Sequence, residues 1–227
     1  MNMKEIICKT NLSIFHELGI LFIFVITGII GRTVLVGMQI QPFPNFEIIM
    51  VLTFLSVIFI RPMLAFLVPL FAMIGSDLII GNTIFVGNHM NKIIIFTYTG
   101  FLIITMISML IRKKGTNRLR YLSGSSMSSI IGTGIIFVFI YDLWTNIGWW
   151  YLMYPHSLEH LTAVMIASTP FIVYHILSAS FTFTFIAIPV GYLLLNRTSL
   201  PLSLDYRFLQ QLPLCVLTMI LLIITFI

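Results

Sequence analysis

Hydrophobic residues in this chain form long runs separated by short polar segments, and most runs are long enough to cross a membrane as helices. We expect seven such spans, at residues 14–36, 46–60, 62–80, 92–111, 127–143, 171–195 and 209–227. The second span is short, because at 1.5 Å per residue it reaches about 22 Å, whereas the hydrocarbon core is ~30 Å thick. Such a helix either lies inside a bundle or thins the bilayer around it.

Prolines predict where the runs break. A continuous helix over 158–195 would be about 57 Å long, and Pro170 must break or kink it. We therefore interpret 158–169 as a separate interfacial or re-entrant helix that leads into the next span. Broken backbone at membrane depth is tolerated where it is buried in protein or lines a cavity. Pro69 and Pro189 predict kinks in two other spans.

The composition leaves little room for a soluble protein. The chain is 59% hydrophobic and 8% charged, whereas soluble domains carry about 25% charged residues. We expect an all-α, polytopic membrane bundle that forms one transmembrane domain over residues 1–227. The formal net charge of +5 does not indicate a nucleic-acid partner, because lysine and arginine stand at the ends of the spans. Their partner there is the lipid bilayer.

The basic residues predict the orientation of the spans. Only Arg32 and Lys92 fall on one side. The other side holds Lys4, Lys9, Arg61, Arg112, Lys113, Lys114, Arg118, Arg120, Arg197 and Arg207. By the positive-inside rule, the N-terminus and the 112–120 loop are cytoplasmic. The C-terminus then lies outside the cell membrane, and three connections, at residues 37–45, 81–91 and 142–160, face outward.

The third outer connection is aromatic and lacks lysine and arginine. It contains Trp144, Trp149, Trp150, Tyr151 and Tyr154. Tryptophan and tyrosine gather at membrane interfaces, so one interpretation is an aromatic belt. The other is a wall for a planar ligand, since ligand pockets combine flat rings with a few polar groups. Asn146 and Asp142 are candidates for those polar groups.

Two charged residues lie inside predicted spans at similar depth. Arg32 and Asp77 are costly in hydrocarbon and need a reason to be there. They either form an ion pair that locks two helices together, or one of them binds an ionised group of a ligand. His175, also within a span, is interpreted first as a histidine satisfied by a neighbour. Glu17 and His16 are expected to snorkel toward the interface.

The third connection also contains the pattern His-x-x-Glu-His at His156, Glu159 and His160, which occurs in one class of zinc peptidases. Histidines four residues apart share one helix face, as zinc binding requires. Peptidases with this motif are large soluble proteins, unlike this chain. The alternative is the first turn of a helix after Pro155, where Glu159 suits the helix dipole.

Two blocks of the chain carry a family resemblance. The first contains Pro44-Asn45-Phe46, Leu67-Val68-Pro69-Leu70 and Ser76-Asp77-Leu78 with Gly81. The second contains Thr145-Asn146, Trp149, Tyr154-Pro155, Leu161 and Thr169-Pro170-Phe171. From Arg32 to Leu195 the chain resembles a family of small prokaryotic membrane proteins of unassigned function. Members of that family are similar to the substrate-binding S components of energy-coupling-factor (ECF) vitamin transporters.

This resemblance implies a six-helix core at residues 32–195, an additional C-terminal span at 209–227, and no enzymatic activity. An S component captures a vitamin-like molecule from outside, and a membrane coupling protein with two ATPase subunits drives its entry. The chain has no Walker-type phosphate loop, so ATP use would belong to those partners. No cofactor is expected. The implied pocket is lined by Phe43, Asn45, Asn146, Trp149, Trp150 and Tyr154, with Asp77 and Arg32 beneath it.

Departures from the S-component pattern keep two alternatives open. The span at 209–227 is extra, and the first helix lacks the Ala-x-x-x-Ala pattern for docking to a coupling protein. Thr27, Gly28 and Gly31 form only a weaker small-residue face. The chain is alternatively a structural or accessory subunit packed among other subunits of a larger membrane complex. A metal-binding membrane enzyme built on His156, Glu159 and His160 is the third reading.

Overall fold

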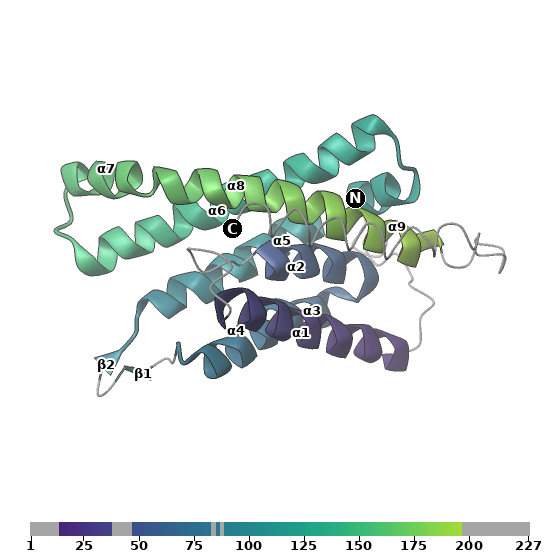
Figure 1. Cartoon of the computed structure of the whole chain (residues 1–227), viewed down its shortest axis with the longest axis horizontal. Helices are drawn as coiled ribbons and strands as arrows, with labels where there is room; N and C mark the ends of the chain where they lie inside the picture. The colour runs from purple at the N-terminus through teal and green to yellow at the C-terminus, as the bar shows by residue number, and fades with distance from the viewer. Residues whose placement is uncertain (1–13, 38–46, 83–84, 87–88, 197–227) are drawn as a thin grey trace, which may run out of the picture. The chain divides into compact units, whose positions relative to one another are not determined.

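Almost every residue that the computed structural model describes is helical (Figure 1). The described residues are 14–37, 47–82, 85–86 and 89–196. The chain divides into two compact units, residues 1–192 and 193–227, and nearly all described residues belong to the first. The predicted span at 209–227 and the candidate pocket residues Phe43 and Asn45 lie outside the described residues.

The helices follow one another in a simple up-and-down order. Their bounds are α1 Ile14–Gly37, α2 Glu47–Phe59, α3 Pro62–Ala65, α4 Leu67–Ile80, α5 Ile93–Arg120, α6 Gly124–Met153, α7 Leu158–Ala167, α8 Thr169–Thr182, the π-helical turn η2 Phe183–Ala187, and α9 Ile188–Asn196. Between α4 and α5, a two-stranded hairpin pairs β1 (Phe85–Val86) with β2 (His89–Met90) in antiparallel register.

Five helical stretches are long and apolar enough to cross a membrane. They are Ile14–Val36, Pro62–Ile80, Ile93–Arg120, Gly124–Met153 and Thr169–Asn196. These stretches correspond to five of the seven predicted spans, and together they indicate a multi-pass membrane protein. The short second span is α2, and the helix predicted before Pro170 is α7.

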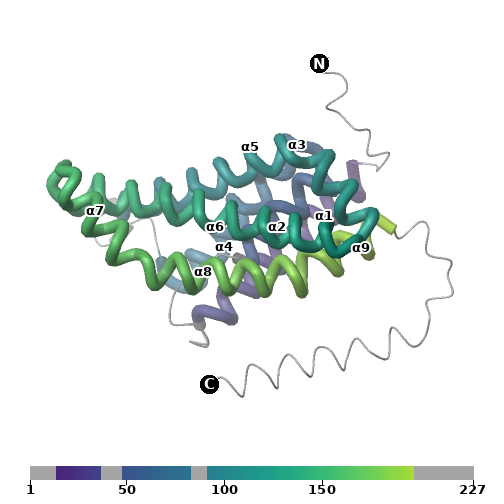
Figure 2. The backbone as a smooth tube through the Cα atoms, turned by 90° about the horizontal axis from the view of Figure 1, so that it is seen from above, coloured from purple at the N-terminus to yellow at the C-terminus, as the bar shows by residue number. Residues whose placement is uncertain are grey.

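The short helix α2 is the centre of the bundle. Its residues from Ile49 onward, together with Ile60, are all buried. The helix contacts α1, α4, α5, α6, α8 and η2, and Figure 2 shows it enclosed by the longer helices. A helix that is hydrophobic on every side must be covered on every side. Of the two readings of this short span, the structure therefore favours a position inside the bundle.

Proline explains both irregularities in the helices. Pro69 has no N–H for the carbonyl of Ala65, and the helix breaks between α3 and α4 at Phe66. The hydroxyl of Ser56 on α2 donates to that carbonyl at 3.4 Å. Pro189 acts in the same way on the final helix, where the N–H of Ile188 reaches back five residues and forms the π-helical turn η2.

Two predicted span boundaries were wrong. The segment at 112–120, predicted as a basic loop, forms the last turns of α5. The aromatic connection at 142–160 is helical up to Met153, so all three tryptophans lie on α6. Hydropathy falls where polar residues begin. A helix can nevertheless continue beyond that point, when its residues favour helix and its end packs against other helices. Leu119, which packs against Gly191, is fully buried at the end of α5.

The small residues of α1 are used inside the chain. A Cβ at Gly28 would lie 2.9 Å from that of Ala72 on α4, and a Cβ at Gly31 would lie 2.8 Å from Ile48 on α2. These glycines therefore let α1 approach its own neighbours closely. Their surface is covered by α2 and α4 and is not exposed for contact with a coupling protein.

Candidate functional site

A cavity of about 490 Å³ lies between α5, α6, α7 and α8. Its polar lining residues are Thr97, Tyr141, Asp142, Thr145, Asn146, Ser168 and His175, and its apolar and aromatic ones are Trp149, Tyr154, Val164, Ala167, Phe171 and Ile172. The chain reverses direction between α6 and α7, and α7 and α8 then run back beside α6 with a short break at Ser168 (Figure 1). The cavity is the main candidate site of the described residues.

An acid–histidine pair forms a buried polar part of the cavity lining. Nδ1 of His175 on α8 lies 2.9 Å and 3.0 Å from the two carboxylate oxygens of Asp142 on α6. Asp142 is 5% exposed. The expectation that a neighbour satisfies His175 is therefore confirmed. The neighbour is a carboxylate, so the cavity wall carries a charged or strongly polar pair.

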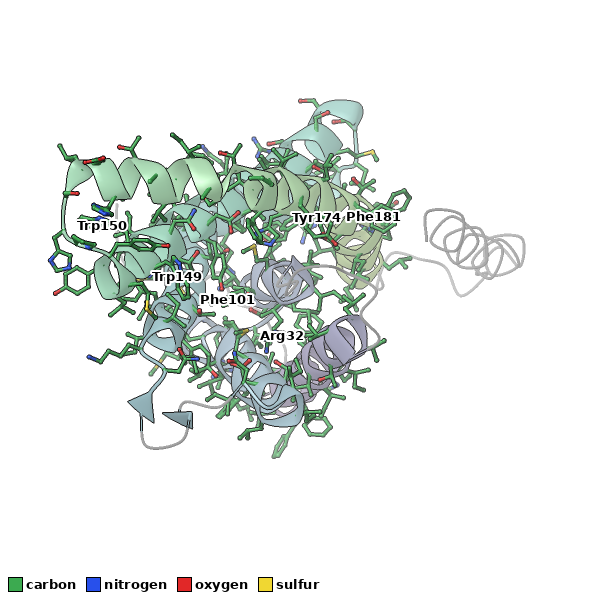
Figure 3. All side chains as sticks on the ribbon, turned by 60° about the vertical axis from the view of Figure 1, so that its left-hand side comes forward. Arg32, Phe101, Trp149, Trp150, Tyr174 and Phe181 are labelled. Carbon is green, nitrogen blue, oxygen red and sulfur yellow. The ribbon has the colours of Figure 1, made fainter. Side chains whose placement is uncertain are left out.

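Aromatic side chains line the outer part of the cavity. Trp149 and Tyr154 are 42% and 43% exposed, and Phe171 on α8 is also exposed. Trp150 does not line the cavity. Its indole N–H donates to the backbone carbonyl of Ser157 at 3.2 Å and thereby ties α6 to the start of α7. Figure 3 shows Trp149 and Trp150 near α7, away from Arg32.

Asn146 connects the two walls of the cavity. Its side-chain Nδ2 donates to the hydroxyl of Ser168 at 2.8 Å, and that hydroxyl donates to the carbonyl of Met165 at 2.9 Å. Ser168 is the single residue between α7 and α8. The hydrogen bond from α6 therefore fixes the helix break that forms the roof of the cavity.

The Arg32–Asp77 pair forms a separate, closed network. Nη1 of Arg32 lies 2.6 Å from Oδ1 of Asp77 and donates to the Ser76 hydroxyl at 2.6 Å. The carboxylate also accepts from the Asn82 amide at 3.1 Å and from the Tyr98 hydroxyl at 2.8 Å. Arg32 and Asp77 are each 3% exposed. Neither residue is among those that line the cavity, and their ion pair joins α1 to α4.

A second ion pair, with a buried carboxylate and a half-exposed arginine, joins α1 to the turn after α2. Glu17 is fully buried, and its Oε2 accepts from the backbone N–H of Arg61 at 3.1 Å and from its Nε at 2.8 Å. The prediction that Glu17 snorkels was wrong, because Arg61, in extended backbone before Pro62, presents its backbone N–H and its side-chain Nε to the carboxylate. His16 is exposed, as expected.

The His-x-x-Glu-His pattern is not gathered into a metal site. Nε2 of His156 lies 2.9 Å from the carbonyl of Tyr151, and the two rings are stacked. Nδ1 of His160 lies 2.7 Å from the hydroxyl of Ser157, the N-cap of α7. Glu159 lies exposed in the first turn of α7. No group of three metal-binding side chains occurs within the described part of the chain.

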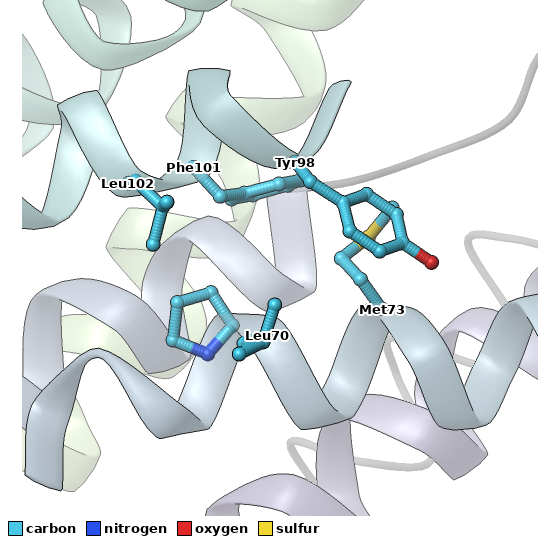
Figure 4. Close-up of a pocket in the computed structure, with 6 residues that line it drawn as sticks. Leu70, Met73, Tyr98, Phe101 and Leu102 are labelled. Atoms are coloured by element: carbon cyan, nitrogen blue, oxygen red, sulfur yellow. The ribbon is translucent and has the colours of Figure 1, made fainter. Parts of the chain in front are cut away.

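A narrow crevice lies between α4 and α5. It is lined by Pro69, Leu70, Met73, Tyr98, Phe101 and Leu102 (Figure 4). The crevice has no room for a water molecule. Its side chains pack the two helices together beside the Asp77 network.

The sequence predicts only part of this site. Among the predicted pocket residues, Asn146, Trp149 and Tyr154 line this cavity, as does the polar candidate Asp142. The sequence does not predict Ser168, Thr97, Thr145, Phe171 or the role of His175. Pro170 was the available signal for Ser168, because broken backbone at membrane depth is tolerated only where it is buried in protein or lines a cavity. The pairing of Asp142 with His175, 33 residues away, left no local signal.

The fold and the site define the class of protein: a helical bundle with several helices long enough to span a membrane and, among the described residues, a cavity between α5, α6, α7 and α8. The chain belongs to a family of unknown function, DUF6580, whose model matches residues 13–202. No curated protein and no solved structure is detectably similar to it.

Proposed function

We propose that this chain is a membrane-embedded subunit that captures a small molecule in the cavity between α5, α6, α7 and α8, in the manner of an ECF S component. The observation that carries the proposal is the cavity itself, whose volume is about 490 Å³. Ligand sites have volumes of ~300–1,000 Å³ and combine apolar and aromatic walls with a few placed polar groups. Trp149, Asn146 and the Asp142–His175 pair fit that description.

The position of the cavity supports capture from outside the cell. Thr97 lines the cavity near the start of α5, whereas Arg112 to Arg120 occupy its last turns. Thr97 and Arg112 are separated by about 22 Å along the helix, at 1.5 Å per residue. By the positive-inside rule, the basic end of α5 faces the cytoplasm. The cavity then opens on the opposite side.

Transport would require partners, as it does for S components. In this proposal, a membrane coupling protein and ATPase subunits supply the energy, and this chain supplies recognition. Gly28 and Gly31 of α1 pack against α4 and α2, so in this proposal a coupling protein would contact the larger exposed side chains of α1. Phe15, Phe22 and Ile23 are among them.

The test is purification in a mild detergent, followed by mass spectrometry of the small molecules released on denaturation and of the co-purifying proteins. We expect a stoichiometric small molecule with the wild-type protein, and loss of that molecule from Tyr154→Ala. Tyr151→Ala is the matched control, because Tyr151 is 55% exposed nearby but does not line the cavity.

Two results would contradict the proposal. If Tyr151→Ala and Tyr154→Ala retain the molecule equally, the cavity is not its site. If no small molecule is found and a fixed set of unrelated membrane subunits co-purifies, the chain is an accessory subunit of a larger complex. Co-purification with ATPase subunits would support the transport role.

A further inference from the structure

We infer that the cavity selects a planar aromatic base that carries a positive charge, with the charge toward Asp142 and the ring against Trp149, Tyr154 and Phe171. This inference rests on the proposed function and names the chemical class of its ligand. It follows from two independent properties of the lining: its charge and the chemistry of its rings.

The first property is the net charge of the lining. Among the described residues that line the cavity, the acid is Asp142, the histidine is His175, and there is no lysine or arginine. With a neutral histidine the lining carries one negative charge, and with a protonated histidine it carries none. In neither state is the lining positive. A phosphate or carboxylate ligand would lose its hydration without gaining a net opposite charge, which is costly in a buried site.

For a cationic ligand, the same lining makes a favourable electrostatic contribution to the binding free energy. The carboxylate of Asp142 is almost fully buried, and a cationic ligand beside it would be attracted to an opposite charge. In a site that excludes water, that attraction is stronger than on an exposed surface. The two oxygens of Asp142 have about four acceptor positions, and among the described residues Nδ1 of His175 lies within hydrogen-bond distance of both oxygens but fills at most two of those positions. The carboxylate therefore has capacity for a donor from a ligand.

The second property is the set of rings. Trp149, Tyr154 and Phe171 come from α6, the turn after it, and α8. Aromatic faces carry partial negative charge and attract cations, and tryptophan does so most strongly. Aromatic rings also pack well against a flat ligand in offset or edge-to-face geometry. The rings and the carboxylate therefore favour the same ligand, which is flat and positively charged.

The experiment measures binding of three probes of similar size by isothermal titration calorimetry on the purified full chain in detergent. The probes are 1-methylquinolinium, a cation; quinoline, which is neutral at neutral pH; and quinoline-2-carboxylate, an anion. We expect the cation to bind at least about tenfold more tightly than the anion. In Asp142→Asn, affinity for the cation should fall about tenfold, while affinity for quinoline changes by less than about twofold.

Glu159→Gln is the matched control, because it removes an exposed carboxylate nearby that does not line the cavity. It should leave all three affinities unchanged. If Asp142→Asn does not fold, Trp149→Leu replaces it and should weaken binding of the cation more than binding of quinoline.

The outcomes separate the two proposals. The inferred preference for a cationic ligand is wrong if the anion binds as tightly as the cation. It is also wrong if the preference for the cation survives Asp142→Asn and Trp149→Leu. In both cases the proposed binding role remains. Equal losses in Asp142→Asn and Glu159→Gln also overturn the inferred preference, because the effect would then be long-range electrostatics. Failure of all three probes to bind at millimolar concentration counts against the proposed function, and the inference falls with it.

Discussion

Asp77 and Asp142 are buried to nearly the same extent, at 3% and 5% exposure, yet their surroundings differ completely. Asp77 pairs with an arginine and accepts further hydrogen bonds from Asn82 and Tyr98. Asp142 contacts one histidine nitrogen and faces a cavity of about 490 Å³. Burial alone therefore does not distinguish a structural carboxylate from a candidate binding group. The number of donors that the protein itself supplies does.

The packing around the two carboxylates differs in the same way. The crevice beside Asp77 has no room for water, and α1 and α4 meet at glycine and alanine. The break at Ser168 leaves open space beside Asp142. We therefore expect changes in the closed region to affect stability, and changes in the cavity to affect binding.

The largest effect is expected for Asp77→Ala. It leaves the guanidinium of Arg32 buried without its carboxylate, and breaking a buried ion pair in this way costs about 3–5 kcal/mol in free energy of unfolding. Thermal unfolding in detergent, followed by size-exclusion chromatography, measures it. The double variant Arg32→Met with Asp77→Leu should recover much of the loss. A single variant as stable as wild type would mean that the pair does not join α1 to α4.

A smaller effect is expected for Gly134→Ala on α6. The new Cβ would lie 2.5 Å from the ring of Phe183, which is fully buried against Phe54 and Phe137. Overpacking of this kind costs about 1–3 kcal/mol. The matched control is Gly132→Ala, where a Cβ meets nothing within 4 Å, so that alanine should be neutral or stabilising. Equal melting temperatures for the two variants would contradict this close packing.

Tyr98→Phe should weaken the closed region slightly. It removes one donor to the Asp77 carboxylate, and a hydrogen bond to a charged group contributes about 1.5–3 kcal/mol. Because Arg32 and Asn82 still donate to the carboxylate, the loss in free energy of unfolding should be near the lower end of this range. Chemical denaturation of Tyr98→Phe beside Tyr151→Phe, whose side chain is 55% exposed, measures the difference. Indistinguishable midpoints would show that the network does not depend on this hydroxyl.

The smallest effect on stability is expected for Ala167→Leu, because its added volume enters the cavity. The side chain at position 167 is exposed and lines the cavity, so the free energy of unfolding should change by no more than about 0.5 kcal/mol. Binding of 1-methylquinolinium should be lost. A variant that melts far below wild type, or that binds the probe normally, would show that the space beside Asp142 is not an open site.

The sequence predicts the existence of the helices in this fold more accurately than it predicts where they end. Unbroken apolar runs reveal helices, and Pro69, Pro170 and Pro189 mark the irregularities correctly, because a missing N–H is a local property. The ends of α5 and α6 were misplaced, since both helices continue past the point where hydropathy falls. Only packing, such as that of Leu119 against Gly191, extends them.

The site was predictable only in part. Trp149 and Trp150 are neighbours in sequence, but consecutive residues on a helix point about 100° apart, and only Trp149 lines the cavity. Composition cannot make that distinction without the orientation of α6. The Asp142–His175 pair needs the packing of α8 on α6, which no local pattern encodes.

The most direct test of the contrast between the two regions uses two matched threonines. Thr145 lines the cavity, and Thr105 is fully buried, but each hydroxyl donates to the carbonyl four residues before it, at 3.0 Å and 2.8 Å. With Cys8 and Cys215 replaced by serine, Thr145→Cys and Thr105→Cys are exposed in intact cells to a membrane-impermeant maleimide. We predict that Thr145→Cys is labelled from outside and that Thr105→Cys is not. Equal labelling of the two, or labelling of Thr145→Cys only after the membrane is permeabilised, would contradict an outward-facing cavity.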